Sequence, residues 1–184
     1  VTYTASMDGK IEMQNDRIVV LPVHEVSGNA ELAEGNIDFR GDIVIHGNVE
    51  SGVNIRATGS ITIDGVAEAC MLEAGKDIIL RGGMLGGNKA SVKTKGAITA
   101  KFFEFTNILC EGDLQADVLM DCSVICHGQI RLTGRKGSII GGKVQAIRGL
   151  IATSLGNDAE KRTEIFVGAG IDVYSRLRVM EKKI

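Results

Sequence analysis

The chain has 184 residues, a formal net charge of −2, and a composition that is 44% hydrophobic but only 4% aromatic. This composition allows one core of Ile, Val, Leu and Ala side chains and excludes a core built on large rings. No apolar run approaches the roughly 20 residues of a membrane span, no secretion signal is recognisable, and the four cysteines lack a disulfide-framework spacing. We therefore expect a soluble, cytoplasmic protein.

The first expected element is a small hairpin near the N-terminus. Two short strand-like runs, at residues 10–13 and 17–20, flank a turn rich in Asn and Asp at residues 14–16. We assign residues 1–35 to an N-terminal strand and hairpin that caps the unit that follows.

A repeated pattern then occupies the chain from Phe39 to Ile151. In each repeat a mostly small residue is followed, four and six positions later, by two mostly aliphatic ones. The segments are Phe39/Ile43/Ile45, Ala57/Ile61/Ile63, Ala74/Ile78/Leu80, Thr94/Ile98/Ala100, Cys110/Leu114/Ala116, Cys126/Ile130/Leu132 and Ile147/Ile151. Their central aliphatic residues are 18, 17, 20, 16, 16 and 21 positions apart, which suits one coil of a parallel β-helix.

The repeat predicts the fold class. Alternation within each segment sends two aliphatic side chains to one face of a short strand, and stacking at about 4.8 Å per coil builds a continuous apolar column. We therefore predict an all-β fold, a single-stranded parallel β-helix of about seven coils over residues 36–157. Glycines near the turns are expected to be there for their access to positive φ; they are Gly41, Gly47, Gly59, Gly65, Gly75, Gly96, Gly112, Gly128 and Gly149.

Residues 158–184 are expected to close the solenoid. Residues 163–167 are typical of a last strand, and Val173, Leu177, Met180 and Ile184 follow at spacings of 4, 3 and 4. This spacing predicts a short C-terminal helix, either packed on the end of the solenoid or beginning a coiled coil that joins copies of the chain into a homo-oligomer.

Charge is unevenly distributed along the repeat. Residues 1–77 carry 13 acids and 5 bases, whereas residues 78–157 carry 5 acids and 10 bases. The two longest coils contain Gly-rich insertions that we expect to bulge out as loops, and such insertions often mark the binding face of a solenoid. The candidate partner-binding residues on or beside them are Lys89, Lys93, Arg135, Lys136 and Lys143, and an acidic protein surface is the expected partner.

The order of these motifs resembles the flagellar assembly protein A family. The residues that carry the resemblance are the runs at 35–49 and 52–61, and the shorter matches at 74–78, 82–84, 98–102 and 139–146. The resemblance covers about residues 7–170 and implies a right-handed bacterial cytoplasmic β-solenoid. It also implies a longer protein, with an N-terminal domain and a C-terminal coiled coil that are not complete here. The implied role is a scaffold in flagellar assembly, motility or cell-pole organisation, with no catalytic residues.

A hexapeptide-repeat acyltransferase is one rival interpretation. A six-residue step of aliphatic positions runs from Ile37 to Ile61 but stops there, because Ala67 and Glu73 occupy the next positions. Such enzymes need a histidine near the acceptor hydroxyl. His46 and His127 lie at turn sites and His24 precedes the repeat, so we expect no catalytic histidine.

Other chemistries are weighed in the same way. A metal site at Cys122, Cys126 and His127 is disfavoured, since Cys126 should point inward above Cys110 while His127 points to solvent. Phosphate or nucleic-acid binding by the basic loops lacks a helix N-terminus and stacking aromatics, because Phe102, Phe103 and Phe105 are expected in the core. We expect no cofactor and no metal. A self-assembling, bactofilin-like filament remains the structural alternative.

Overall fold

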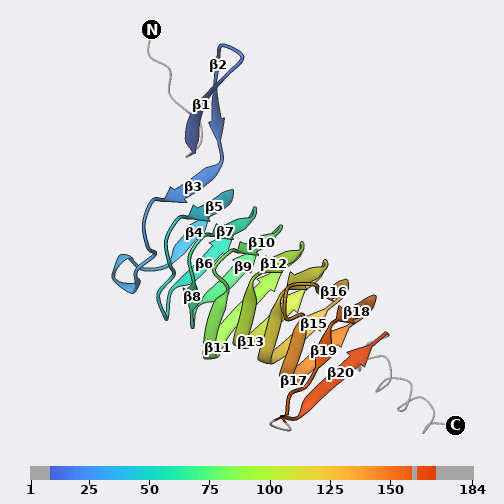
Figure 1. Cartoon of the computed structure of the whole chain (residues 1–184). Helices are drawn as coiled ribbons and strands as arrows, with labels where there is room; N and C mark the ends of the chain where they lie inside the picture. Colours follow the sequence, from blue (N-terminus) through green and yellow to red (C-terminus); the bar gives the residue numbers. More distant parts are fainter. Residues whose placement is uncertain (1–8, 159–160, 169–184) are drawn as a thin grey trace, which may run out of the picture.

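The chain folds into a parallel β-solenoid in the computed structural model, which describes residues 9–158 and 161–168 (Figure 1). The first ten strands are β1 (Lys10–Gln14), β2 (Arg17–Leu21), β3 (Val23–Val26), β4 (Ile37–Phe39), β5 (Asp42–Ile45), β6 (Asn54–Ala57), β7 (Ile61–Ile63), β8 (Ala67–Glu68), β9 (Met71–Ala74) and β10 (Ile78–Leu80), with a 3-10 helix, η1, at Leu32–Glu34. The remaining strands are β11 (Met84–Thr94), β12 (Ile98–Ala100), β13 (Phe102–Cys110), β14 (Leu114–Ala116), β15 (Val118–Cys126), β16 (Gln129–Leu132), β17 (Ser138–Ala146), β18 (Gly149–Ala152), β19 (Ser154–Leu155) and β20 (Thr163–Val167).

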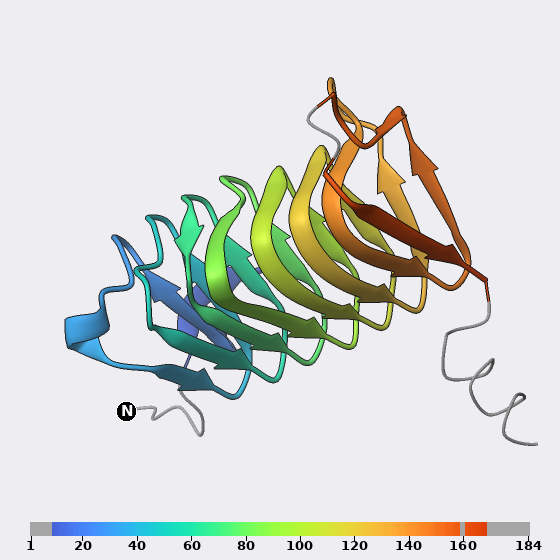
Figure 2. The ribbon, with the colours of Figure 1, turned by 90° about the horizontal axis from the view of Figure 1, so that it is seen from below.

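Two parallel sheets run the length of the solenoid. Among the described residues, sheet 1 has eight strands in the order β18-β16-β14-β12-β10-β7-β5-β3, and sheet 2 has ten, along the path β19-β17-β15-β13-β11-β9-β6-β4. In sheet 2, β8 also pairs with β11 and β20 with β17. Figure 2 shows the successive coils lying over one another. The predicted all-β parallel solenoid is confirmed, and β3 extends its first sheet to Val23.

The expected apolar column forms the core. Ile43, Ile61, Ile78, Ile98, Leu114 and Ile130 pair in register from coil to coil, and each is fully buried. The smaller residue four positions earlier forms a second column, in which Cys110 pairs with Cys126 as expected. Two in-register columns of aliphatic and small side chains therefore explain why the chain manages with so few aromatic residues.

The structure shifts the last segment of the predicted repeat by one residue. Ala146 and Leu150, not Ile147 and Ile151, stand opposite Cys126 and Ile130. Ile151 pairs with Arg131 on the outer face and is 48% exposed. Ala146 occupies the small-residue position because its neighbour in the column is the buried Cys126. The size of the side chain therefore sets the register at this coil, and its apolar character alone does not.

Most turn glycines serve close packing, which corrects the expectation of positive φ. Gly41 and Gly149 have φ of 156° and 135°, but the other seven glycines of that set do not have positive φ. At Gly75 an added Cβ would overlap the carbonyl oxygen of Thr58 in the coil below. Glycine is therefore required at this turn because the backbone of one coil rests directly on that of its neighbour.

Side-chain oxygens link the turns of successive coils. The Asp42 carboxylate accepts from Ser60 N–H at 2.7 Å, and the Asp77 carboxylate accepts from Ala97 N–H at 2.7 Å. Asn48 N–H donates to Asn29 Oδ1 at 2.9 Å in an equivalent bond at another corner. These groups satisfy turn amides that have no strand partner.

The Gly-rich insertion expected as a loop at residues 82–89 does not bulge out, and most of it, residues 84–89, belongs to a strand. This part lies inside β11, where the register against β13 shifts between Leu85 and Ala90. Asn88 has a φ of 62° there, and Phe105 and Asp121 have φ of 45° and 49° in β13 and β15. The insertion is thus a bulge at the bend that these long strands share, visible in Figure 2.

The strands predicted on either side of the repeat are present in the described residues. β1 and β2 form the expected antiparallel hairpin, with Asn15 and Asp16 at φ of 51° and 58° in its turn. The hairpin projects from β3 away from the stacked coils (Figure 1). The last predicted strand is confirmed as β20, which pairs with β17. The predicted C-terminal helix lies outside the described residues.

The core register predicts opposite effects at two adjacent positions of β10. Ile78→Asp should lower the free energy of unfolding by at least about 3 kcal/mol, because it places an unpaired carboxylate in the fully buried column. Ile79→Asp should change it by less than about 1 kcal/mol, since Ile79 is 36% exposed on the outer face. Urea unfolding of both variants measures the difference, and similar midpoints would contradict this register.

Candidate partner-binding surface

The structure separates the five predicted partner-binding residues into different surfaces. Lys89 and Lys93 belong to β11, and Lys143 belongs to β17. Arg135 and Lys136 lie in the bend at residues 133–137, between β16 and β17. Of the second predicted Gly-rich insertion, residues 134–137 therefore lie outside the strands, whereas residues 141–143 belong to β17.

Two of the three candidate lysines on the strands, Lys93 and Lys143, contact side chains of neighbouring coils. Lys93 Nζ lies 3.5 Å from Glu73 Oε1, and Arg56 Nη2 lies 2.9 Å from Glu73 Oε2. Asp38, Arg56, Glu73 and Lys93 form one outward column with alternating charge. Lys143 Nζ lies 5.3 Å from the centre of the Phe166 ring, in a cation–π contact. These contacts occupy both lysines within the solenoid itself.

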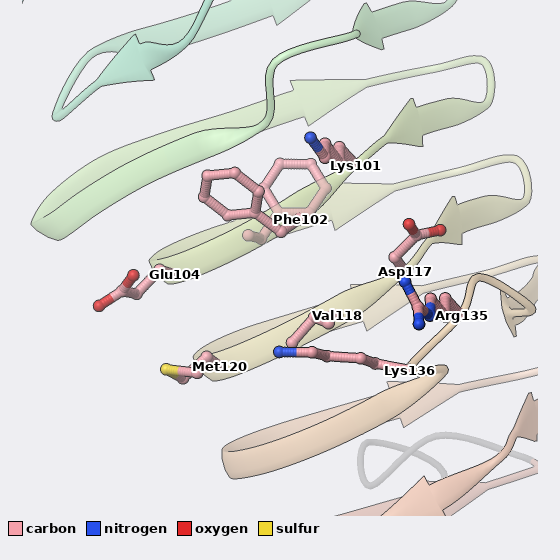
Figure 3. Close-up of a pocket in the computed structure, with 9 residues that line it drawn as sticks. Lys101, Phe102, Glu104, Asp117, Val118, Met120, Arg135 and Lys136 are labelled. Atoms are coloured by element: carbon pink, nitrogen blue, oxygen red, sulfur yellow. The ribbon is translucent and has the colours of Figure 1, made fainter.

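Arg135 and Lys136 border a pocket of about 360 Å³, here named the Phe102 pocket. Figure 3 shows the pocket between the bend at 133–137 and the first residues of β13 and β15. Its lining residues are Lys101, Phe102, Phe103, Glu104, Asp117, Val118, Met120, Arg135 and Lys136.

Strand alternation builds the floor of the Phe102 pocket. Phe103 points inward and is fully buried, so Phe102 before it faces outward and is half-buried. Phe102 pairs in register with Val118, and Glu104 with Met120. Phe105 is likewise only half-buried. The expectation that Phe102 and Phe105 belong to the core is therefore wrong, whereas that for Phe103 is confirmed.

Glycine at position 83 leaves room for the Phe102 ring. A Cβ there would lie 2.5 Å from Phe102 Cδ1, and the φ of Gly83 is +89°. The ring therefore lies against the backbone of the preceding coil. The sequence pattern predicts the cations of this site but assigns Phe102 to the core; the aromatic residue at the head of β13 is the signal that could have identified the site.

A change in coil length forms the wall of the pocket. Between β14 and β15 one residue, Asp117, makes the corner, because Ala116 and Val118 end and begin those strands. In the next coil the same corner, between Leu132 and Ser138, contains the five residues 133–137. The four additional residues place Arg135 and Lys136 beside the apolar floor (Figure 3).

Three cations and two carboxylates surround this floor. Lys101, Arg135 and Lys136 are exposed, while Glu104 and Asp117 are half-buried. No ion pair joins any of these five side chains to another group in residues 9–158 or 161–168. The rim therefore presents a small excess of positive charge that the described part of the molecule does not neutralise.

His46 lies in a ladder of charges on another surface. Its Nε2 lies 2.8 Å from Glu25 Oε1 and its Nδ1 lies 2.9 Å from Asp64 Oδ2, each from a neighbouring coil. Asp64 also lies 3.3 Å from Arg81 Nη1. The hydrogen bond to Glu25, followed by that to Asp64, raises the pKa of His46 above 6.5.

The cysteines are buried free thiols. Burial raises the pKa of Cys70 to about 12 and that of Cys122 to about 11. The hydrogen bond with Cys126, together with burial, also raises the pKa of Cys110. His127 is exposed beside buried Cys126, as the alternation predicts. No cluster of three or more metal-binding side chains occurs in the described ranges.

These features define the chain as a parallel β-solenoid whose described surface includes in-register columns and an apolar pocket with a cationic rim. Residues 22–184 match the model of the Flagellar Assembly Protein A β-solenoid domain. The chain therefore belongs to this family, which confirms the resemblance seen in the sequence, and it is a protein related to flagellar assembly. Searches of curated proteins and of solved structures found no match. No helix of the described part is long and apolar enough to span a membrane.

The contacts of His46 predict a pH-dependent contribution to stability. Because its pKa is raised in the folded state, the contribution is complete below pH 6.5 and is lost as the pH rises through the folded-state pKa. His46→Gln should therefore lower the urea midpoint at pH 5.5 more than at pH 8.5. The effect should be small, since all three side chains are partly exposed. An equal shift at both pH values would contradict an ionised His46.

Proposed function

We propose that this protein is a non-enzymatic scaffold and protein-interaction module in the assembly of the bacterial flagellum. The observation that carries the proposal is the family match over residues 22–184, of which the stacked coils from β3 to β20 are the structural counterpart. A solenoid holds its outward side chains at regular spacing along an extended surface, which suits the simultaneous binding of partners.

The placement of the titratable groups supports a non-enzymatic role. His46 is held between two carboxylates on the outer surface, and burial in the core raises the pKa of the Cys70 and Cys122 thiols. A nucleophile or general base needs a lowered pKa or access to a substrate, together with a partner that orients it. The surroundings of His46 do not favour a general base, and those of the buried Cys70 and Cys122 thiols do not favour a nucleophile.

Location and partners form the finer part of the proposal. We place the protein in the cytoplasm, with the cell pole as a candidate site, and its partners among acidic surfaces of flagellar or pole-associated proteins. Nucleic acid is a poorer partner, because two cations on the strands are already engaged: Lys93 is paired with a carboxylate and Lys143 lies over an aromatic ring. Joining of copies through the predicted helix in residues 169–184 belongs to the same proposal.

The scaffold proposal predicts specific neighbours in the cell. The full-length protein would be crosslinked in the bacterium that encodes it, and its partners identified by mass spectrometry, beside a deletion strain whose flagella are counted by electron microscopy. We expect crosslinks to flagellar or pole-associated proteins and fewer flagella in the deletion strain. Self-crosslinks alone, with normal flagella, would contradict the proposal.

A filament former is the second candidate, favoured by the two ends of the solenoid. Val26, Ile37 and Phe39 are only partly buried at the first coil, and Leu150 and Ile165 are only partly buried at the last. Leu155 and Val167, on the last two strands, are each 58% exposed. Sheet ends of this kind can pair with another copy.

Removal of the flanking segments separates the two candidates. A chain lacking residues 1–21 and 169–184 keeps every strand from β3 to β20. If the flanks prevent end-to-end stacking, this chain should form polymers that sediment and appear as filaments by electron microscopy. We expect it to stay monodisperse under the scaffold proposal, with the full chain analysed in parallel at the same concentration.

A further inference from the structure

We infer that the Phe102 pocket docks a short protein segment that carries one apolar anchor side chain beside acidic residues. The inference rests on the proposed scaffold function and names the chemistry of one of its partners. One corner of the solenoid combines an apolar floor with cations that have no ionic partner in the described part of the chain.

The floor suits a single apolar side chain. Phe102, Val118 and Met120 are half-buried and face outward from adjacent coils, with fully buried Phe103 beneath them. The volume of about 360 Å³ lies near the lower limit of the roughly 300–1,000 Å³ typical of ligand pockets. An aromatic ring and a thioether adapt well to Phe, Leu or Met anchors. This floor therefore fits an anchor residue of a peptide.

The rim selects for carboxylates on either side of the anchor. Lys101, Arg135 and Lys136 are exposed, and Figure 3 shows the Lys136 side chain extending along Val118. Arginine and lysine form charge-assisted hydrogen bonds with carboxylates. An Asp or Glu next to the anchor can therefore meet a cation while the apolar side chain rests on Phe102.

The surroundings favour a protein segment over nucleic acid. Glu104 and Asp117 line the same pocket and would repel a phosphate backbone, whereas a peptide can direct backbone N–H groups toward them. Both the apolar floor and the cations then contribute to peptide binding. Buried apolar anchors with nearby arginine are typical of binding hot spots between proteins.

The test uses the purified full chain and a panel of fluorescein-labelled eight-residue peptides. Each parent peptide has Phe, Leu or Met at its centre and Asp or Glu on both sides. In matched peptides either the anchor is Ser or the acids are Asn and Gln. Fluorescence anisotropy measures affinity, and the Met120 methyl resonance reports contact with the floor. We expect binding only of peptides with both features, and a shift of the Met120 methyl signal.

Variants of the chain locate the site. Val118→Asp and the double variant Arg135→Ala/Lys136→Ala should each lower the affinity for the parent peptides by at least about tenfold. The control Lys76→Ala/Lys95→Ala removes the same charge from exposed positions outside the pocket and should change affinity by less than about twofold. Thermal melts confirm that each variant is folded. An equal loss in the control would identify non-specific charge attraction and overturn the inference.

The peptide results and crosslinking in cells decide whether the inference holds. If no anchor peptide binds, or if the Ser peptides bind equally well, the inference is wrong. Crosslinking in cells with Arg135→Ala/Lys136→Ala then distinguishes the two proposals. If flagellar proteins are recovered from wild type and not from the variant, the pocket is supported. If the variant recovers all the same proteins, the scaffold function stands without this site.

Discussion

In-register stacking of successive coils is the constraint on which the rest of this molecule depends. Each coil bonds to the coils above and below at a spacing of about 4.8 Å, so every side chain meets its counterparts twice. Inside, this requires small residues beside Cys110 and Cys126 and aliphatic ones in the column of Ile78. At the turns, the same closeness excludes a Cβ from Gly75. Substitution in one coil therefore acts on both neighbours.

The same constraint explains the chemistry of the outer surface. Like charges at successive coil positions would repel, and the column from Asp38 to Lys93 alternates in sign instead. Such columns largely neutralise their own charge. A concave site needs coils of unequal length, and the corner at residues 133–137 supplies that difference beside Phe102. The location of the pocket therefore follows from coil length more than from the number of cations.

The repeat pattern made most of the fold predictable, because burial in a solenoid selects the same residue type at each coil. Prediction failed where local features compete. Ile147 and Ile151 were chosen for apolarity although Ala146 fits the small-residue column. The insertion at 86–89 is absorbed by a strand bulge, which spacing cannot distinguish from a loop. The charge pattern identifies Arg135 and Lys136 but not their apolar neighbour Phe102. Which of the adjacent aromatic residues faces outward depends on where the strand begins after the corner, and the sequence does not show this.

The floor and the rim of the Phe102 pocket should contribute differently to binding. Phe102, Val118 and Met120 lie on strands whose backbone is bonded to adjacent coils, so little order has to be gained when a ligand covers them. Arg135 and Lys136 lie outside the strands, and ordering their long side chains opposes binding. The apolar floor should therefore supply most of the affinity. The cations should mainly select the charge of the partner and speed its approach.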